Sequence, residues 1–186
     1  IPHKAEMVKK VVANNIPIIS EIEFAFRYKG NSRIVCITGS NGKTTTTSLC
    51  FDIFKRAGYD VSLVGNIGYS FARQIALQPT AWYVMEISSF QLDDITSFRP
   101  DIAVITNITP DHLDRYNYDF SAYVSAKFNI ARHQLPEDHL VLNLDDEACK
   151  KYLQENTLTP KILFFTMNES LNTDGAYVNN NEIMTR

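Results

Sequence analysis

The stretch Ile34-Val35-Cys36-Ile37-Thr38-Gly39-Ser40-Asn41-Gly42-Lys43-Thr44-Thr45 decides the fold of this chain. It reads as an apolar β-strand, a glycine turn, and then a lysine and threonines that open a helix. Glycines let the backbone curl so that successive N–H groups point at an anion, and a helix N-terminus adds free N–H groups and partial positive charge. Lys43 can bring a cation to the outer phosphates of a nucleotide, and the Thr44 hydroxyl can ligate the accompanying magnesium.

This stretch therefore predicts a phosphate-binding loop made of seven consecutive residues, namely Gly39, Ser40, Asn41, Gly42, Lys43, Thr44 and Thr45. Its spacing, G-x-x-G-K-T, is two residues shorter than the general G-x-x-x-x-G-K-[ST] motif. A glycine-lysine turn by itself could also be an ordinary connection between a strand and a helix. The order of strand, turn and helix favours nucleotide binding.

Size and composition indicate a globular α/β protein. The chain has 186 residues, of which 45% are hydrophobic, and strand patterns alternate with helical patterns. We expect a mostly parallel sheet flanked by helices, as in nucleotide-binding P-loop proteins. The net charge is −3 without a lysine-arginine cluster, which argues against nucleic-acid and anionic-membrane partners. No apolar run approaches the roughly 20 residues of a membrane helix and no signal peptide is recognisable, so we expect a cytoplasmic protein with free thiols at Cys36, Cys50 and Cys149.

Two regions are expected along the chain. Residues 1–30 read as a lead-in with helices over 3–13 and 21–28, which links to a preceding N-terminal portion. Residues 31–186 read as the nucleotide-binding domain. Because the chain starts without methionine and stops in the middle of a pattern, we expect it to be a piece of a longer protein that is truncated at its C-terminal end. In the second region we expect helices over 43–57 and 119–132, and a third that follows Asp145-Asp146 and ends near residue 155. We expect strands over 61–64, 81–87, 102–106, 139–144 and 161–166, and a hairpin over 176–184 with an asparagine turn.

Glu86 and Asn66 are candidate site residues at the carboxyl ends of strands. Glu86 closes the apolar run 81–87, where a carboxylate is costly unless it is paired or bound to a metal. In phosphate-loop enzymes such an acid helps to hold magnesium, although Glu86 could also be exposed at the rim of the sheet. Asn66 lies between two glycines at a position where ligands bind in open α/β sheets, but it could equally be a turn residue.

Polar residues after the next two strands extend the candidate site. Ser88 and Gln91 offer a hydroxyl and an amide to a ligand, and helix capping is the alternative. His112 lies between Asp111 and Asp114 just past a strand, which suggests a second cation or phosphate site. By its local sequence alone, Lys127 reads as a surface lysine whose aliphatic stem covers apolar surface.

Together these motifs resemble the ATP-dependent Mur ligases of peptidoglycan synthesis, within the Mur ligase and folylpolyglutamate synthase superfamily. The resemblance covers residues 16–150 well and the tail loosely. It is carried by Thr38 to Thr44, Gly65-Asn66-Ile67-Gly68, Glu86-Ile87-Ser88-Ser89-Phe90-Gln91-Leu92, Asn107 to Tyr116, Tyr123 to Lys127, and Asn143-Leu144-Asp145-Asp146. The second and third of these motifs look most like the members that add D-glutamate to UDP-N-acetylmuramoyl-L-alanine.

The resemblance implies that this chain is the central ATP-binding domain, without the N-terminal and C-terminal domains of the family. It implies that a substrate carboxylate attacks the γ-phosphorus of ATP and that an amino acid then attacks the acyl phosphate. In this comparison Lys43, His112 and Lys127 are catalytic, while Asn66, Ser88 and Gln91 lie near the muramoyl side of the substrate. One Mg²⁺ is held by Thr44 and Glu86. A second is held by His112 and by Lys127, provided that Lys127 is carbamylated as the matching lysine is in these ligases.

Three alternatives remain at this point. The first is another amide ligase of the superfamily, such as another Mur ligase or a folylpolyglutamate synthase, against which the string Glu86 to Gln91 argues. The second is a module that binds ATP without ligation. The third is a dinucleotide-binding oxidoreductase, which the absence of G-x-G-x-x-G after the first strand disfavours.

Overall fold

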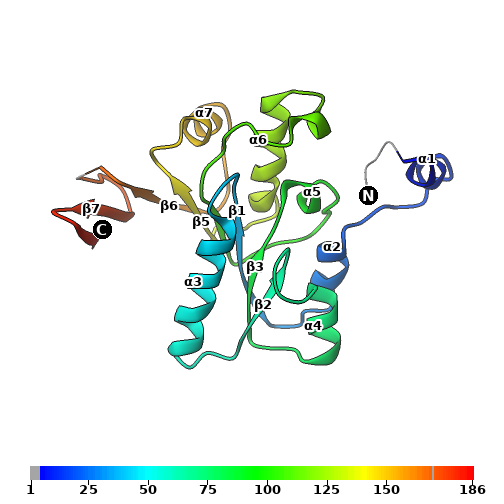
Figure 1. Cartoon of the computed structure of the whole chain (residues 1–186), viewed down its shortest axis with the longest axis horizontal. Helices are drawn as coiled ribbons and strands as arrows, with labels where there is room; N and C mark the ends of the chain where they lie inside the picture. The colour runs from blue at the N-terminus through cyan, green and yellow to red at the C-terminus, as the bar shows by residue number, and fades with distance from the viewer. Residues whose placement is uncertain (1–4, 169) are drawn as a thin grey trace.

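One eight-stranded sheet organises the chain, in the order β2-β3-β1-β4-β5-β6-β7-β8 (Figure 1). The computed structural model describes residues 5–168 and 170–186. The strands are β1 (Arg33–Thr38), β2 (Val61–Gly65), β3 (Trp82–Glu86), β4 (Ile102–Ile105), β5 (His139–Asn143), β6 (Lys161–Thr166), β7 (Gly175–Asn179) and β8 (Glu182–Thr185). All neighbouring pairs are parallel except β7 and β8, which are antiparallel.

Helices connect the parallel strands, as a parallel sheet requires. They are α1 (Glu6–Ala13), α2 (Glu21–Phe26), α3 (Lys43–Arg56), α4 (Phe71–Leu77), α5 (Ser89–Leu92), α6 (Phe120–Phe128) and α7 (Glu147–Glu155), with 3₁₀ turns η1 (Leu113–Tyr116) and η2 (Asn129–Ala131). Among the described residues, no helix is long and apolar enough to cross a membrane.

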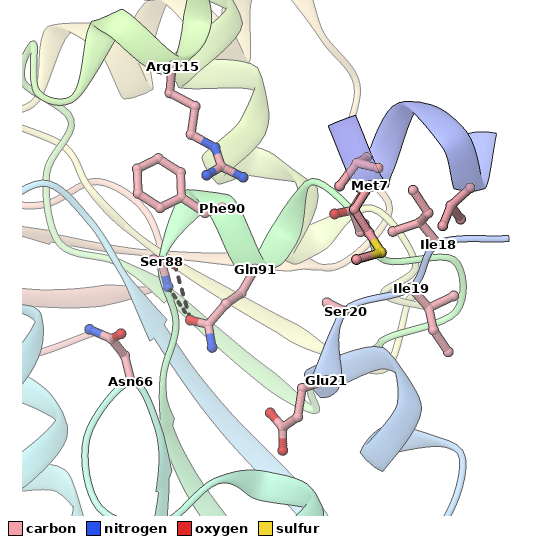
Figure 2. Close-up of a pocket in the computed structure, with 13 residues that line it drawn as sticks. Met7, Ile18, Ile19, Ser20, Glu21, Asn66, Ser88, Phe90, Gln91 and Arg115 are labelled. Atoms are coloured by element: carbon pink, nitrogen blue, oxygen red, sulfur yellow. Dashed lines mark hydrogen bonds between the residues drawn. The ribbon is translucent and has the colours of Figure 1, made fainter. Parts of the chain in front are cut away.

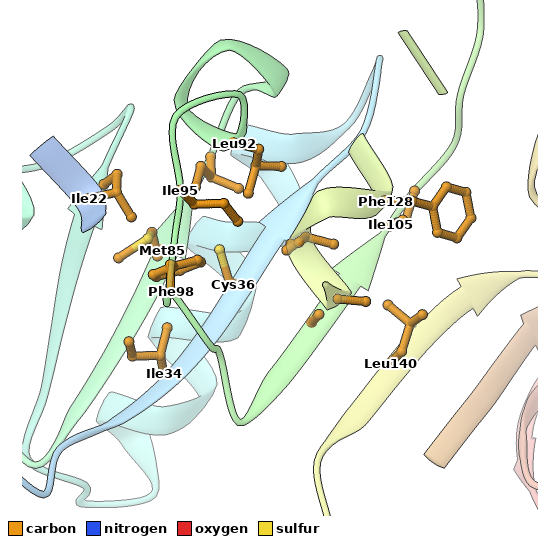
Figure 3. Close-up of a cluster of buried hydrophobic side chains, with 14 of the residues drawn as sticks. Ile22, Ile34, Cys36, Met85, Leu92, Ile95, Phe98, Ile105, Phe128 and Leu140 are labelled. Carbon is orange, nitrogen blue, oxygen red and sulfur yellow. The ribbon is translucent and has the colours of Figure 1, made fainter. Parts of the chain in front are cut away.

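The central strand β1 is buried on both of its faces, as its continuous apolar run predicts. Ile34 and Cys36 belong to the larger core, which the sheet shares with α2 and α6 (Figure 3). Val35 and Ile37 point to the opposite face and pack with Phe51 and other residues near α3. Cys36, Cys50 and Cys149 are free thiols, as predicted, and Cys36 and Cys149 are buried.

Strand order places the candidate site at one edge of the sheet. β1 lies between β3 and β4, although both follow it by dozens of residues in the chain. The carboxyl ends of these parallel strands meet, so the loops after β1, β3 and β4 converge. The expected α/β fold with a mostly parallel sheet and flanking helices is thus confirmed.

The N-terminal segment divides into two parts with different packing. Helix α1 buries none of its residues, and Figure 1 shows it standing apart from the sheet. Helix α2 contributes Ile22 and Ala25 to the main core. Its Glu23 is fully buried, and the carboxylate accepts hydrogen bonds from the backbone N–H groups of Thr96, Ser97 and Phe98. The residues before β1 are therefore tied to the connection between α5 and β4.

Most differences from the expected elements lie at their ends. The first predicted helix starts at Glu6, and its expected beginning at residues 1–4 falls outside the described residues. The second helix ends at Phe26 instead of residue 28. The helix expected over 119–132 continues after Phe128 only as η2. The sequence analysis assigned no element to α4, which begins after Ser70, whose side chain accepts the N–H of Arg73.

Candidate active site

The loop between β1 and α3 adopts a phosphate-binding shape because two of its glycines have backbone conformations that other residues rarely reach. Gly42 has φ +79° directly before α3. At Gly39, an added Cβ would lie 2.0 Å from Thr106 Oγ1. The first N–H groups of α3 have no partner within the helix, so they are open to an anion. Lys43 Nζ folds back over the loop and donates to the carbonyl oxygens of Gly39 (3.0 Å) and Ser40 (2.8 Å).

The end of β4 braces this loop. The buried Ser40 hydroxyl donates to the carbonyl oxygen of Thr109 over 2.8 Å and lies 3.1 Å from the Tyr123 hydroxyl. The Asn41 N–H donates to Asn107 Oδ1 over 3.0 Å. Ser40 therefore shapes the loop with its side chain. Asn107 and Thr109 are site residues that were not predicted individually, and their one signal in the sequence is their place just after a strand.

Glu86 connects the loop to the neighbouring strand β3. Its side chain is 2% exposed, so the alternative of an exposed rim residue is wrong. Thr44 Oγ1 donates to Glu86 Oε2 over 2.6 Å, and Asn66 Nδ2 donates to Glu86 Oε1 over 2.8 Å. A hydroxyl and a carboxylate are hard oxygen ligands of the kind that Mg²⁺ prefers, so these residues fit a magnesium ion. Thr45 is exposed in the first turn of α3.

Lys127 reaches the same loop from α6. It is 2% exposed, so its interpretation as a surface lysine is wrong. Its Nζ donates to the carbonyl oxygen of Gly39 over 2.8 Å and lies 4.6 Å from the centroid of the Tyr123 ring. Burial, together with the nearby charge of Lys43, lowers the pKa of the Lys127 ammonium to about 7, and Asp111 partly offsets this shift. Burial at this position therefore favours the neutral amine of Lys127 more than solvent does.

A small chamber of about 210 Å³ brings together side chains from the loops after β2, β3 and β4 and from helices α3, α5 and α6. It is lined by Lys43, Asn66, Ser88, Ser89, Phe90, Asp111, His112, Tyr123 and Lys127. His112 is 63% exposed, has φ +49°, and its Nε2 lies 3.7 Å from Asp111 Oδ2. Within residues 5–168 and 170–186, no three His, Cys, Asp or Glu side chains form a preformed metal cluster.

A larger cleft of about 740 Å³ adjoins the chamber (Figure 2). Asn66, Ser88 and Phe90 line both spaces, so the two cavities adjoin at these residues. Gln91 lines only the larger cleft, and its Oε1 accepts the N–H of Ser88 (3.0 Å) and the Ser88 hydroxyl (3.2 Å). Ser88 and Gln91 thus form the capping pair that opens α5, and both also face the cleft.

The sequence of this chain is similar to those of known ligases. The sequence matches the family described as "Mur ligase middle domain" over residues 37–185. It is 46% identical over 179 residues to a UDP-N-acetylmuramoylalanine–D-glutamate ligase of Porphyromonas gingivalis, covering 96% of this chain and 40% of that protein. It is also 46% identical over 186 residues to the UDP-N-acetylmuramoylalanine–D-glutamate ligase of Bacteroides fragilis, covering 99% of this chain and 41% of that protein. The chain thus spans about two fifths of the length of these relatives.

Solved structures agree in fold. The UDP-N-acetylmuramate:L-alanyl-gamma-D-glutamyl-meso-diaminopimelate ligase of Neisseria meningitides superposes with a TM-score of 0.67 at 20% identity, over 100% of this chain and 62% of that chain. The MurF ligase of Thermotoga maritima, solved in complex with ADP, superposes with a TM-score of 0.62 at 21% identity, over 89% of this chain and 40% of that chain. By its sequence match and its fold, the chain belongs to the Mur ligase family, in which it corresponds to the middle domain.

Proposed function

We propose that the complete protein containing this chain is an ATP-dependent ligase of peptidoglycan precursor synthesis, which joins D-glutamate to UDP-N-acetylmuramoyl-L-alanine. This chain is its ATP-binding middle domain. The observation that carries the proposal is the hydrogen-bonded series Thr44–Glu86–Asn66, which links the phosphate loop to the wall of the larger cleft. The relatives at 46% identity are named as D-glutamate ligases, which supports the choice of D-glutamate.

Positioning and positive charge are the main contributions of this chain to such a reaction. The loop N–H groups and Lys43 bind the β- and γ-phosphates, while Asn66 and Ser88 orient the acceptor where the two cavities meet. The acceptor carboxylate then attacks the γ-phosphorus, giving an acyl phosphate and ADP. The amino group of the second substrate displaces phosphate from that acyl group and forms the amide. The charge of Lys43 reduces the repulsion between the carboxylate and the triphosphate.

Thr44 and Glu86 are the residues that would hold a first Mg²⁺, which when bound neutralises phosphate charge. His112 and Lys127 face the same chamber and would hold a second one. A protonated lysine cannot do so, because an ammonium has no lone pair. The depressed pKa of Lys127 makes its amine available to carbon dioxide, and the resulting carbamate is an anionic oxygen ligand.

The rest of the complete protein has its own part in this proposal. The chamber and the cleft are open at the sheet edge, so other domains supply the remaining contacts to the nucleotide and to the amino acid. Residues 1–30 lead from an N-terminal domain into the middle domain at 31–186. The 186-residue chain alone should bind Mg-ATP weakly and should not form amide bonds. A cytoplasmic location of the reaction is part of this proposal.

The test is phosphate release by the complete protein with ATP, Mg²⁺ and UDP-N-acetylmuramoyl-L-alanine across a panel of amino acids. Release that depends on D-glutamate supports the proposal. Release with another amino acid keeps the ligase mechanism and changes the substrate. No release with any amino acid, while ATP still binds, would identify a module that binds nucleotide without ligation. Ligation by the 186-residue chain alone would contradict the need for other domains.

A further inference from the structure

Arg115 occupies a distinctive place in the larger cleft. It belongs to η1, three residues after His112, and it is the only cation among the described residues that line this cleft. Its guanidinium carbon lies 4.1 Å from the centroid of the Phe90 ring, and its side chain is 22% exposed. Figure 2 shows the guanidinium beside Phe90, directed toward the space between Phe90 and the apolar residues Met7 and Ile18.

Phe90 links this cation to the chamber. The ring lines both cavities, with Arg115 4.1 Å from its centroid and the His112 ring in an edge contact at 5.6 Å. Both Arg115 and His112 come from the segment that follows β4. A group that binds Arg115 in the cleft therefore lies beside the phosphate chamber.

Among residues 5–168 and 170–186, the Arg115 guanidinium has an ion pair but no hydrogen bond. Its Nε lies 3.7 Å from Asp93 Oδ2, which is an ion pair too long for a direct hydrogen bond. The Tyr116 hydroxyl donates to the same carboxylate over 3.3 Å, and burial raises the pKa of Tyr116 to about 12, so it stays a donor. A guanidinium has five N–H donors in a fixed fork, suited to two oxygens of a carboxylate or a phosphate.

The charges elsewhere in the cleft indicate where an anion can sit. Glu21 and Asp94 also line it and would repel an anion. Glu21 Oε1 accepts the N–H of Ala72 over 2.6 Å, which places its charge at α4. The favourable end is thus the one formed by Arg115, Phe90 and Ser88, where the cleft adjoins the chamber.

We propose that Arg115 binds an anionic group of the acceptor substrate, on the face of Phe90, and so sets where the acceptor enters the chamber. This inference rests on the proposed function, because the acceptor of that reaction carries both a carboxylate and a diphosphate. Either anion has the chemistry that a guanidinium recognises. Arg115 is a binding residue for the acceptor and has no part in binding ATP.

The experiment uses the complete protein and three variants. Arg115→Met removes the charge, and Arg115→Lys keeps the charge but loses the planar fork. Arg33→Met is the matched control, because Arg33 also combines an aromatic contact (4.4 Å to Trp82) with an ion pair (3.4 Å to Asp101), at the start of β1 and far from both cavities. Calorimetry measures the Kd for UDP-N-acetylmuramoyl-L-alanine and for ATP separately, and steady-state kinetics give KM and kcat.

For Arg115→Met we expect the acceptor Kd and KM to rise about 10- to 100-fold, as expected for losing a charge-assisted hydrogen bond. The ATP Kd and the kcat at saturating acceptor should stay within about threefold of wild type. The acceptor Kd and KM of Arg115→Lys should lie between those of wild type and those of Arg115→Met. All measured constants of Arg33→Met should match wild type. N-acetylmuramoyl-L-alanine and UDP-N-acetylglucosamine, which carry the carboxylate and the diphosphate respectively, show which anion is bound, because only one should lose affinity in Arg115→Met.

Failure of the proposed function and failure of the role of Arg115 give different experimental results. If wild type binds no acceptor, the proposed function fails and the role of Arg115 fails with it. If wild type binds the acceptor and Arg115→Met binds it equally well, only the role of Arg115 is overturned. If Arg115→Met also loses ATP binding, Arg115→Lys decides: weaker acceptor binding with normal ATP binding supports the role, and unchanged acceptor binding refutes it.

Discussion

Replacing Glu23 by Gln should destabilise the fold strongly, although Glu23 lies outside the site. Its Oε2 accepts three backbone N–H groups, from Thr96 (3.0 Å), Ser97 (2.9 Å) and Phe98 (2.8 Å). The hydroxyls of Thr96 and Ser97 donate to Oε1, with Arg27 Nε at 3.1 Å. The glutamine keeps one acceptor oxygen, and the two hydroxyls can turn to accept from its NH₂ group.

The expected cost follows from the loss of charge on a fully buried acceptor. A hydrogen bond to a charged group contributes about 1.5 to 3 kcal/mol, whereas a neutral one contributes about 0.5 to 1.5 kcal/mol. Over the three backbone N–H bonds, the free energy of unfolding should fall by about 3 kcal/mol. The assay is urea unfolding of the 186-residue chain at pH 7, followed by the fluorescence of Trp82, the one tryptophan. Glu155→Gln, an exposed member of a 3.9 Å ion pair with Lys151, is the control and should not change stability measurably.

The pH dependence gives a second, independent check on Glu23. Burial by itself would raise the pKa of its carboxyl, but the hydrogen bonds from Ser97 and Thr96 hold it well below the ordinary range. A carboxyl with a depressed folded-state pKa stabilises the fold above its unfolded pKa of about 4.3, and this stabilisation is lost as the pH falls below that value. The difference between wild type and Glu23→Gln should shrink by about 1 to 2 kcal/mol between pH 6 and pH 3. A difference below about 1 kcal/mol at pH 7, or one that does not change with pH, would refute the reasoning.

Two further predictions concern the chamber. Lys43→Ala should abolish ATP binding in calorimetry while the unfolding curve stays that of wild type, because the hydrogen bonds of Nζ to the described residues go to two loop carbonyls, those of Gly39 and Ser40. Unchanged ATP affinity would count against the phosphate loop. Glu86→Gln should raise the Mg²⁺ concentration needed for half-maximal phosphate release by the complete protein at least about tenfold, since an amide is a weaker ligand for magnesium than a carboxylate. A magnesium dependence equal to that of wild type would reject the metal role of Glu86.

Strong local signals were read correctly from the sequence. The strand, glycine turn and helix over 34–56 require only short-range geometry, and the turn residues identify them. The asparagine turn of the C-terminal hairpin is equally local, because Asn180 and Asn181 both adopt positive φ between β7 and β8. Helix α4 was missed because its seven residues give too short a pattern to separate from a loop.

Residue roles that depend on burial could not be read in the same way. Lys127 carries the local pattern of a surface lysine, yet it is buried. Its Nζ donates to the carbonyl oxygen of Gly39, which lies 88 positions earlier in the chain. Arg115 and Asp93 likewise meet only through the fold. The proposed role of Lys127 as a metal ligand rests on the resemblance to a family, whereas its contact with Gly39 is visible only in the structure.

The sequence by itself determined that a phosphate loop follows a buried strand and that a carboxylate ends another strand. Only the tertiary structure decided that these two strands are neighbours, because nothing local encodes the order in which parallel strands pair. That order brings Thr44 within 2.6 Å of Glu86 and aligns the loop after β4 beneath the phosphate loop. Burial then sets the charge of Lys127, since the free energy of a buried ion depends on the groups that the fold places around it.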